Sequence, residues 1–281
     1  MLEILKAILF GIVEGITEWL PISSTGHMIL LDEFIQLDVT AEFYSMFQVV
    51  IQLGAIMAVV ILFWNDFFPF GKRQNRMPLK WNGPLSYVKR DKIILWIKIL
   101  VACVPAAIVG LLFDEQLEAL FYNYQTVSIA LIVFGIAFIV IENRNQNIKI
   151  HSLDELSIQT AFLIGIFQLI AAIFPGTSRS GATIVGALLL GVSRTVAAEF
   201  TFFLAIPVMF GASLLKIVKF GLAFTAHEVI ILLVGMIVAF AVSLFVIQFL
   251  MSYIKKHDFK VFGWYRIALG IIVLVYFMFL A

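Results

Sequence analysis

Long uninterrupted apolar segments constrain this chain more than any other feature. The segments long enough to cross a hydrocarbon core about 30 Å thick as helices are residues 118–141, 195–215, 229–251 and 261–281. Hydrophobic residues make up 62% of the 281 residues and charged residues only 13%, against about 25% charged in ordinary soluble domains. The sequence lacks the alternating ten-residue segments that indicate a transmembrane β-barrel. It therefore predicts an all-α polytopic membrane protein, with residues 1–281 forming one integral membrane domain.

Composition also limits the partners. The 19 Lys and Arg residues nearly balance the 18 Asp and Glu residues and leave a net charge of +1, whereas nucleic-acid binders usually carry a basic excess. We therefore expect membrane lipids, and no nucleic acid, as partners. The single cysteine, Cys103, excludes an intrachain disulfide and a cysteine-based metal cluster. Phenylalanine-rich surfaces facing the lipid would permit a homodimer.

Polar residues divide the chain into two halves with the same order of elements. Each half begins with an apolar stretch that stops at a proline, followed by a polar run, a short apolar piece and three full spans. These elements lie at 2–20, Pro21, 23–25, 26–37, 42–64, 92–113 and 118–141, and again at 157–174, Pro175, 177–180, 181–192, 195–217, 227–252 and 261–280. Aligning Gly11 with Gly165, an offset of 154, also pairs Ser24 with Ser178. We infer an internal repeat.

The short apolar pieces determine the predicted topology. Residues 26–37 would cover only about 18 Å as a helix, which is too little to cross the membrane, so each proline-containing pair is interpreted as a re-entrant hairpin. One hairpin plus three spans crosses the membrane an odd number of times, so repeat two (157–281) is inverted relative to repeat one (1–141). The prediction is six full transmembrane helices plus two re-entrant helical hairpins, whose tips meet near the midplane.

Basic residues orient this arrangement. Twelve Lys and Arg residues fall in connections on one side of the predicted membrane, at 65–91, 142–156, 192–194 and 253–260. The opposite side has Lys6, Lys216 and Lys219. Cytoplasmic loops carry the excess of Lys and Arg. The basic loop 65–91 is therefore predicted to be cytoplasmic, both termini to lie outside, and the site to open outward.

Two glutamates lie inside the first apolar stretch, where an ionised side chain costs about 2.5–3.5 kcal/mol at the centre of a bilayer. Glu14 and Glu18 are four residues apart and therefore share one face of a helix. Such a pair can hold a hard divalent cation, Mg²⁺ or Ca²⁺, or one member can act as a base. The alternative is a protonated pair that only packs inside the protein.

The tip of the first hairpin carries Ser23, Ser24, Thr25 and His27. Hydroxyls beside a histidine can supply a nucleophile and its proton carrier. The same hydroxyls can instead cap a helix start, where Ser and Thr are preferred residues. The hydroxyls alone favour capping, whereas the histidine and the nearby glutamate pair shift the interpretation toward chemistry.

The tip of the second hairpin, residues 175–183, carries Ser178, Arg179, Ser180 and Thr183. Hydroxyls and free N–H groups at a helix start favour an anion, and the guanidinium offers a fixed fork for phosphate oxygens. The alternative is a structural ion pair between the arginine and one of the two glutamates.

Other polar residues in the apolar segments carry weaker signals. Gln48, Gln52 and Gln168 either line a cavity or form interhelical hydrogen bonds. Lys98 and Arg266 are predicted to snorkel, with their apolar stems in the membrane and their charged heads at its surface.

The two tips together resemble a known family. The stretches EGITEWLPISSTGH at 14–27 and PGTSRSGAT at 175–183, with FQVVIQLG at 47–54, closely resemble the bacterial undecaprenyl-diphosphate phosphatase family of the bacitracin-resistance type. The likeness extends over essentially the whole chain. It implies an integral hydrolase of the bacterial cell membrane that removes the terminal phosphate from a polyprenyl diphosphate lipid and so recycles the lipid carrier for peptidoglycan synthesis.

The resemblance also assigns roles to residues. It implies that Glu14 and Glu18 are the acidic pair and that Arg179 clamps phosphate; in our hypothesis a divalent cation held near Glu14 stabilises the developing charge together with Arg179. Ser24 and His27 become the catalytic candidates of the first tip. In our hypothesis Ser24, activated by Glu18 or His27, attacks the terminal phosphorus; a phosphohistidine at His27 and direct attack by water are alternatives. The expected substrate-binding residues are Ser23, Thr25, Ser178, Ser180, Thr183 and Gln52.

A second class of function competes with hydrolysis. Inverted re-entrant repeats are also an architecture of transporters, so the alternative is a transporter or flippase of a lipid phosphate or small anion. A transporter needs a polar pathway on both sides of its site. The basic loops contain no evident track of this kind, although the opposed hairpins would permit one.

Overall fold

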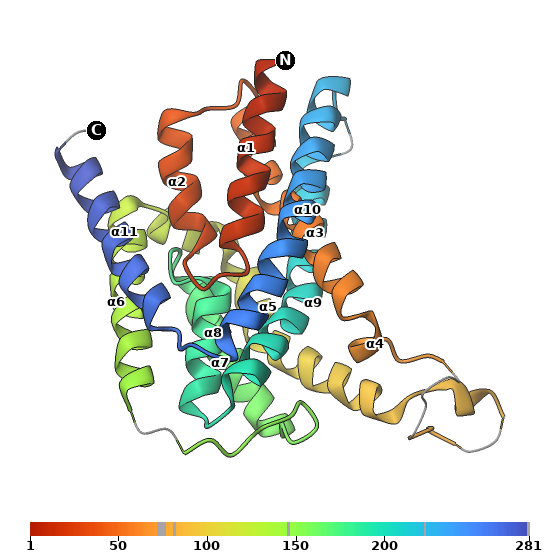
Figure 1. Cartoon of the computed structure of the whole chain (residues 1–281). Coiled ribbons are helices and arrows are strands. Elements are labelled where there is room, and N and C mark those ends of the chain that lie inside the picture. Colours follow the sequence, from red (N-terminus) through yellow and green to blue (C-terminus); the bar gives the residue numbers. More distant parts are fainter. Residues whose placement is uncertain (72–76, 81–82, 145–146, 222, 280–281) are drawn as a thin grey trace.

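The computed structural model describes residues 1–71, 77–80, 83–144, 147–221 and 223–279 (Figure 1). Within these ranges the chain forms helices and no β-strand, in agreement with the predicted all-α class. In chain order the helices are α1 (Leu2–Thr17), α2 (Ser24–Phe34), α3 (Ala41–Leu62), α4 (Trp64–Phe67), the 3₁₀ helix η1 (Pro84–Tyr87), α5 (Arg90–Phe121), α6 (Tyr124–Asn143), α7 (Ile158–Ile173), α8 (Arg179–Leu189), α9 (Arg194–Phe220), α10 (Ala226–Ile254) and α11 (Lys260–Phe279).

Six helices of the described chain are long and apolar enough to cross a membrane, as predicted. They are α3, α5 through Phe113, α6, α9, α10 and α11. The boundary predicted between the second and third spans is wrong, because the backbone stays helical through 113–118 and α5 ends only at Phe121. The next helix starts after Asn123, whose side chain accepts a hydrogen bond from the backbone N–H of Thr126 at 2.9 Å. Asparagine is a strong N-cap residue, whereas acidic residues are tolerated inside a helix.

Two short helical hairpins are formed by α1 with α2 and by α7 with α8. Helices α1 and α7 have 16 residues each, and α2 and α8 have 11 residues each, which corresponds to only about 16 Å for the shorter pair. Figure 1 shows the α1–α2 hairpin descending from one face of the molecule and the α7–α8 hairpin rising from the other. Their turns approach each other in the interior of the helix bundle.

The two hairpin tips begin their second helices in the same way. Ser23 and Ser178 are N-caps with φ of 74° and 68°, and their side chains accept hydrogen bonds from the N–H groups of Gly26 and Gly181. Ser23 therefore corresponds to Ser178, and the pairing of Ser24 with Ser178 in the sequence alignment is wrong by one position. The cause is one extra residue in the second turn, which the ungapped alignment missed.

The two hairpins differ in how deeply they are buried. Helix α8 is buried from Ser180 through Leu188 and packs against α6, α7 and α9. Helix α2 is buried only at Gly26 and Met28. The second hairpin is thus a fixed part of the core, whereas the first presents one side to a pocket.

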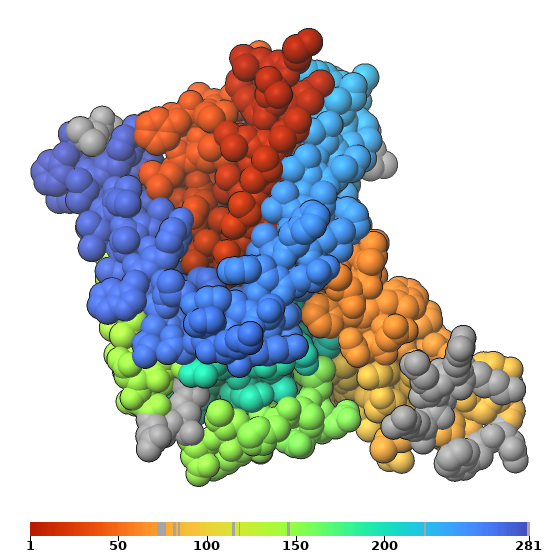
Figure 2. Space-filling view, viewed as in Figure 1, coloured from red at the N-terminus to blue at the C-terminus, as the bar shows by residue number. Residues whose placement is uncertain are grey.

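Helices from opposite ends of the sequence pack closely. Figure 2 shows α1 (red) directly against α10 (light blue), and α10 also packs on α3. At the α3–α10 crossing, a Cβ on Gly54 would overlap the backbone carbonyl of Met236. Small residues of this kind allow membrane helices to approach closely.

Replacing Gly54 by alanine is therefore expected to destabilise the protein. The added methyl must push α3 and α10 apart, and overpacking of this kind costs about 2 kcal/mol, or about 5 °C in melting temperature. Thermal unfolding in detergent measures the effect. Gly211→Ala in α9 is the matched control, because nothing lies within 4 Å of a Cβ at that position. An unchanged melting temperature in Gly54→Ala would contradict the close approach.

Candidate active site

Glu18 joins the two hairpin tips. Its carboxylate accepts a hydrogen bond from Ser24 Oγ at Oε2 (3.1 Å) and an ion-paired hydrogen bond from Arg179 Nη2 at Oε1 (2.9 Å). Its backbone carbonyl accepts a hydrogen bond from Ser180 Oγ at 3.1 Å. Residues more than 150 positions apart in the sequence thus form one polar cluster. The ion pair considered as an alternative to phosphate binding is present, and it is formed with Glu18.

Glu14 lies one turn before Glu18 on α1 and is 1% exposed. The two carboxyl groups interact, as their spacing predicts. Among the described residues, Glu14 Oε1 has no hydrogen-bond partner. A buried carboxyl oxygen without a partner is uncommon in proteins and points to a ligand, a proton or a water at that atom.

Arg179 is the first residue of α8 and has a second anchor. Its Nη1 donates a hydrogen bond to the backbone carbonyl of Thr201 in α9 at 2.9 Å. Its Nε is buried and has no partner among the described residues. The guanidinium is therefore held by Glu18 and by the Thr201 carbonyl, and its Nε–H has no described partner. Thr201 was not predicted, because a backbone carbonyl as a hydrogen-bond acceptor leaves no trace in the residue types.

The other hydroxyls of the tips are largely engaged within the protein. Ser23 and Ser178 cap α2 and α8, as the capping interpretation predicts. Ser178 Oγ also lies 3.1 Å from Ser180 Oγ. Thr183 Oγ1 donates to the Arg179 carbonyl at 2.9 Å and lies 2.9 Å from Thr201 Oγ1. These contacts stiffen the second tip around the arginine.

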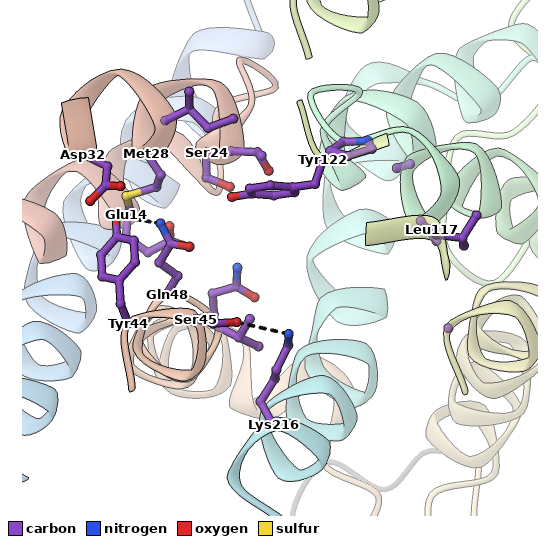
Figure 3. Close-up of a pocket in the computed structure, with 18 of the residues that line it drawn as sticks. Glu14, Ser24, Met28, Asp32, Tyr44, Ser45, Gln48, Leu117, Tyr122 and Lys216 are labelled. Carbon is purple, nitrogen blue, oxygen red and sulfur yellow. Dashed lines mark hydrogen bonds between the residues drawn. The ribbon is translucent and has the colours of Figure 1, made fainter. Parts of the chain in front are cut away.

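A cavity of about 710 Å³ lies beside the cluster (Figure 3). Its lining residues include Glu14, Ser24 and Thr25 from the first hairpin and Gln48 and Gln52 from α3. Apolar groups contribute to the wall as well: Met28, Ile29, Ala171, Ala172, Ile173 and Phe277. This mixture suits a ligand with a polar head and an apolar tail.

Further polar groups lie around the cavity. In Figure 3, Tyr122 points across the space toward Ser24, and Lys216 of α9 reaches toward α3. Lys216 Nζ donates to Ser45 Oγ at 3.2 Å, and Gln48 Nε2 donates to the Tyr44 hydroxyl at 2.8 Å. Gln48 and Gln52 are thus cavity residues, whereas Gln168 is buried without a described partner and does not line the cavity.

His27 is not among the residues that line the cavity. Its Nδ1 lies 2.7 Å from the carbonyl oxygen of Ser23, and its Nε2 lies 2.7 Å from the hydroxyl of Tyr265 in α11. The two rings are nearly parallel, with centroids 5.6 Å apart. The structure brings Glu18, Ser24 and Arg179 together as predicted, but within the described chain His27 forms no hydrogen bond with any of them.

The snorkelling considered for Arg266 is wrong, and Lys98 also forms hydrogen bonds within the protein. Arg266 is 0% exposed and donates to the backbone carbonyls of both hairpin tips. Lys98 is 5% exposed and donates from Nζ to the carbonyls of Leu153 and Asp154. The carbonyl groups of the two tips inside the bundle need donors, and this need holds Arg266 in the protein.

The described residues contain no group of three or more His, Cys, Asp or Glu side chains that could hold a metal ion. The carboxylate ligands proposed for a cation at this site are the two predicted ones, Glu14 and Glu18. The free oxygen of Glu14 fits such a ligand, because Mg²⁺ and Ca²⁺ prefer oxygen ligands and accept water or phosphate in the remaining positions.

The chain is similar over nearly its whole length to known proteins. A relative named Undecaprenyl-diphosphatase 1 from Clostridium acetobutylicum is 65% identical over 279 residues, covering 99% of this chain and 98% of the relative. Undecaprenyl-diphosphatases from Desulfitobacterium hafniense (65% identical; 99% and 97% covered) and Enterococcus faecalis (60%; 98% and 97%) are similarly close. The profile of the family described as bacitracin resistance protein BacA matches residues 7–272, and the chain therefore belongs to the BacA family of bacitracin resistance proteins.

Proposed function

We propose that this protein is an integral membrane phosphatase that hydrolyses undecaprenyl diphosphate to undecaprenyl phosphate and inorganic phosphate. The reaction recycles the lipid carrier of cell-wall synthesis in the bacterial cell membrane and confers bacitracin resistance. Family membership and the names of its relatives support this activity. The observation that carries the proposal is the Glu18 carboxylate, which accepts from the Ser24 hydroxyl with one oxygen and from the Arg179 guanidinium with the other.

The arrangement supports attack by Ser24. As the Ser24 Oγ–P bond forms, the hydroxyl proton passes to Glu18 Oε2, and the bond between the terminal phosphorus and the bridging oxygen breaks. Undecaprenyl phosphate leaves with that electron pair and takes the proton from Glu18, so the carboxylate is ionised again. Water then attacks the phosphoserine, its proton passes to Glu18, and the Oγ–P bond breaks. Ser24 regains a proton from Glu18, and inorganic phosphate leaves.

The surroundings favour Ser24 over the two alternatives. Both ring nitrogens of His27 are hydrogen-bonded, which argues against a phosphohistidine. Ser24 lines the cavity and already donates to Glu18, so direct attack by water would leave this hydrogen bond without a catalytic use. The guanidinium of Arg179 is the group that would stabilise the charge that develops on the terminal phosphate.

A divalent cation, Mg²⁺ or Ca²⁺, belongs to this proposal. Glu14 and Glu18 are the residues that would hold it, and the unpartnered oxygen of Glu14 supports the assignment. When bound, such an ion supplies positive charge to the phosphate oxygens. Thr25, Gln52 and the hydroxyls of Ser23, Ser178, Ser180 and Thr183 are proposed as supporting groups around the polar head. Thr25 and Gln52 are the ones among them that line the cavity.

We propose the membrane topology that the sequence predicts. The α1–α2 and α7–α8 hairpins are re-entrant, repeat two (157–281) is inverted relative to repeat one (1–141), and loop 65–91 is cytoplasmic, although its positions 72–76 and 81–82 lie outside the described residues. Figure 1 supports this: both ends of the drawn chain and the α2–α3 connection lie on one face, and the α6–α7 and α8–α9 connections on the other. The site then opens outward.

The α6–α11 pair supports the inverted repeat as well. A Cβ on Gly135 would lie 2.7 Å from the Gly263 carbonyl oxygen, and a Cβ on Gly270 would lie 2.8 Å from the Ser128 carbonyl oxygen. An offset of 135 positions relates α6 to α11: it takes Gly135 to Gly270 and Ser128 to Gly263. The contact between Gly135 and Gly263 therefore corresponds to the contact between Gly270 and Ser128. Such reciprocal contacts are expected around a pseudo-two-fold axis. A homodimer through the lipid-facing surface also remains a proposal, which cross-linking in membranes tests.

Phosphate release by detergent-purified protein tests the proposed function. Undecaprenyl diphosphate is supplied with Mg²⁺, with Ca²⁺ or with a chelator, and inorganic phosphate is measured. We expect release that depends on the cation. No release by folded protein with either cation would overturn the phosphatase. Movement of an intact lipid diphosphate across liposomes would then favour the transporter or flippase.

Replacing Glu18 by glutamine is expected to lower kcat about 10³-fold, as for loss of a general base. The amide cannot accept the Ser24 proton, and its NH₂ group would face a donor, either Ser24 Oγ or the Arg179 guanidinium. Glu42→Gln, on the exposed first turn of α3, makes the same chemical change away from the site and should keep wild-type kcat. A Glu18→Gln variant with more than about a tenth of wild-type kcat would contradict the role of base.

A further inference from the structure

Arg266 of α11 contacts both hairpin tips at once. Its Nη1 donates to the carbonyl of Pro21 in the first tip at 3.2 Å, and its Nη2 donates to the carbonyls of Gly176 and Thr177 in the second tip at 3.0 Å and 2.7 Å. The residue is 0% exposed. One rigid, planar group therefore fixes the distance between two turns that are about 155 residues apart in the sequence.

The surroundings of the guanidinium are built for this position. Its central carbon lies 5.9 Å from the ring centroid of Phe134. A Cβ on Gly181 would lie 3.0 Å from Nη1, so the glycine in the first turn of α8 leaves the space that the arginine occupies. Among the described residues no carboxylate pairs with Arg266. Its hydrogen bonds go to backbone carbonyls of both tips, so these contacts act on the position of the tips.

Tyr265, the residue before Arg266 on α11, contacts the first tip through His27. Because a carbonyl oxygen can only accept, the contact between His27 Nδ1 and the Ser23 carbonyl assigns a proton to Nδ1. In the neutral ring, Nε2 then accepts from the Tyr265 hydroxyl. Ser23 has φ of 74°, a conformation unfavourable for a residue with a side chain. The Tyr265–His27 contact thus stabilises the peptide directly before Ser24.

We propose that Tyr265 and Arg266 are positioning residues that set the geometry of the reacting cluster from α11. Adjacent residues on a helix point in directions about 100° apart, so the pair reaches two different groups. Arg266 sets the separation of the two tips, and hence the meeting of Glu18 with Arg179. Tyr265, through His27, sets the backbone that carries Ser24. The inference assigns His27 to support of the tip, and it rests on the proposed phosphatase activity.

Kinetics of Arg266 variants test the first part. Arg266→Met is expected to lower kcat about 100-fold, the loss associated with misplacement of reacting groups by about 1 Å, and to change KM less than about threefold because the lipid cavity is intact. Arg266→Lys keeps the charge but cannot reach three carbonyls, so an intermediate kcat is expected. If the methionine variant does not fold, the lysine variant carries the test.

Lys98→Met is the matched control. It removes another buried cation that donates to two backbone carbonyls, those of Leu153 and Asp154, at a connection far from the tips. Both methionine variants should lower the melting temperature, but only Arg266→Met should lower kcat. Wild-type kcat in Arg266→Met and Arg266→Lys would overturn the positioning role. Equal losses of kcat in Arg266→Met and Lys98→Met would reduce Arg266 to a structural residue.

A double-mutant cycle tests the second part. Tyr265→Phe and His27→Ala are each expected to lower kcat about tenfold, and the double variant to lose no more than either, because one chain of contacts is broken in each case. A much larger loss in His27→Ala than in Tyr265→Phe would instead make His27 a catalytic residue. Multiplicative losses would also overturn the proposal. Absence of phosphate release by the wild type is a different outcome, because it removes the proposed function itself.

Discussion

Ser24→Ala is expected to lower kcat about 10⁵-fold, a larger effect than that expected for Glu18→Gln or Arg179→Ala. In the proposed reaction the Ser24 hydroxyl forms the covalent bond to phosphorus, and removing a nucleophile of this kind typically costs 10⁴- to 10⁶-fold. Ser24 Oγ donates to Glu18 at 3.1 Å and the residue lines the cavity, so proton acceptor and substrate space are both in reach. KM should change little, because the arginine and the apolar wall are retained.

Two measurements distinguish a nucleophile from a supporting hydroxyl. Phosphate release gives kcat for Ser24→Ala and for Ser213→Ala, a buried serine of α9 whose Oγ donates to the Val49 carbonyl; the latter should match the wild type. Mass spectrometry of a rapidly quenched wild-type reaction should show a phosphoryl group on the peptide that contains Ser24. Near wild-type kcat in Ser24→Ala would exclude the serine mechanism and leave attack by water or by His27.

Helical spacing made much of this site predictable. Glu14 and Glu18 lie four residues apart, which is sufficient to put them on one face of α1, and the prolines with the following hydroxyls mark where each hairpin turns. The lengths of the apolar segments separate six long helices from two pairs of helices that are too short to span. These are local properties of the chain, and local properties can be read directly from the order of residue types.

The contacts that escaped prediction are made by backbone atoms of distant segments. Arg266 donates to carbonyls of Pro21 and Gly176, and Arg179 donates to the carbonyl of Thr201. Every residue has a carbonyl, so no residue type marks these acceptors. The snorkelling prediction for Arg266 assumed that its partner was water or lipid head groups. The orientation of His27 was equally hidden, because helical spacing gives the face of α2 but not the neighbour that occupies it.

The one-residue error in the repeat alignment has a consequence for chemistry. With Ser23 matched to Ser178, the first residues of α2 and α8 are Ser24 and Arg179. The candidate nucleophile and the candidate phosphate clamp therefore occupy equivalent positions at the starts of two opposed helices. Each points toward the same carboxylate, that of Glu18. Under the proposed inverted repeat, two copies of one structural element would carry different side chains at the same position, as an asymmetric reaction requires.

Arg179→Ala is expected to lower kcat/KM about 10⁴-fold, within the range for arginines that stabilise charge in phosphoryl transfer. The loss has two parts. The developing charge on the phosphate loses its fixed donor, and Glu18 loses the partner of Oε1, so the carboxylate becomes free to rotate away from Ser24. Arg179→Lys should recover part of the activity and remain about 100-fold below the wild type, because an ammonium cannot contact Glu18, the Thr201 carbonyl and a phosphate oxygen in one plane.

Arg194→Lys is the control that separates this role from a structural one. Arg194 is also the first residue of its helix, and it forms a forked ion pair with the buried Glu142, but that pair lies at the other end of the bundle from the cavity. The substitution should lower the melting temperature and leave kcat/KM unchanged. If Arg179→Lys lost no more activity than Arg194→Lys, the Arg179–Glu18 pair would be a structural contact between hairpins. A large loss confined to Arg179 would mean that the same ion pair that closes the fold also prepares the site for phosphate.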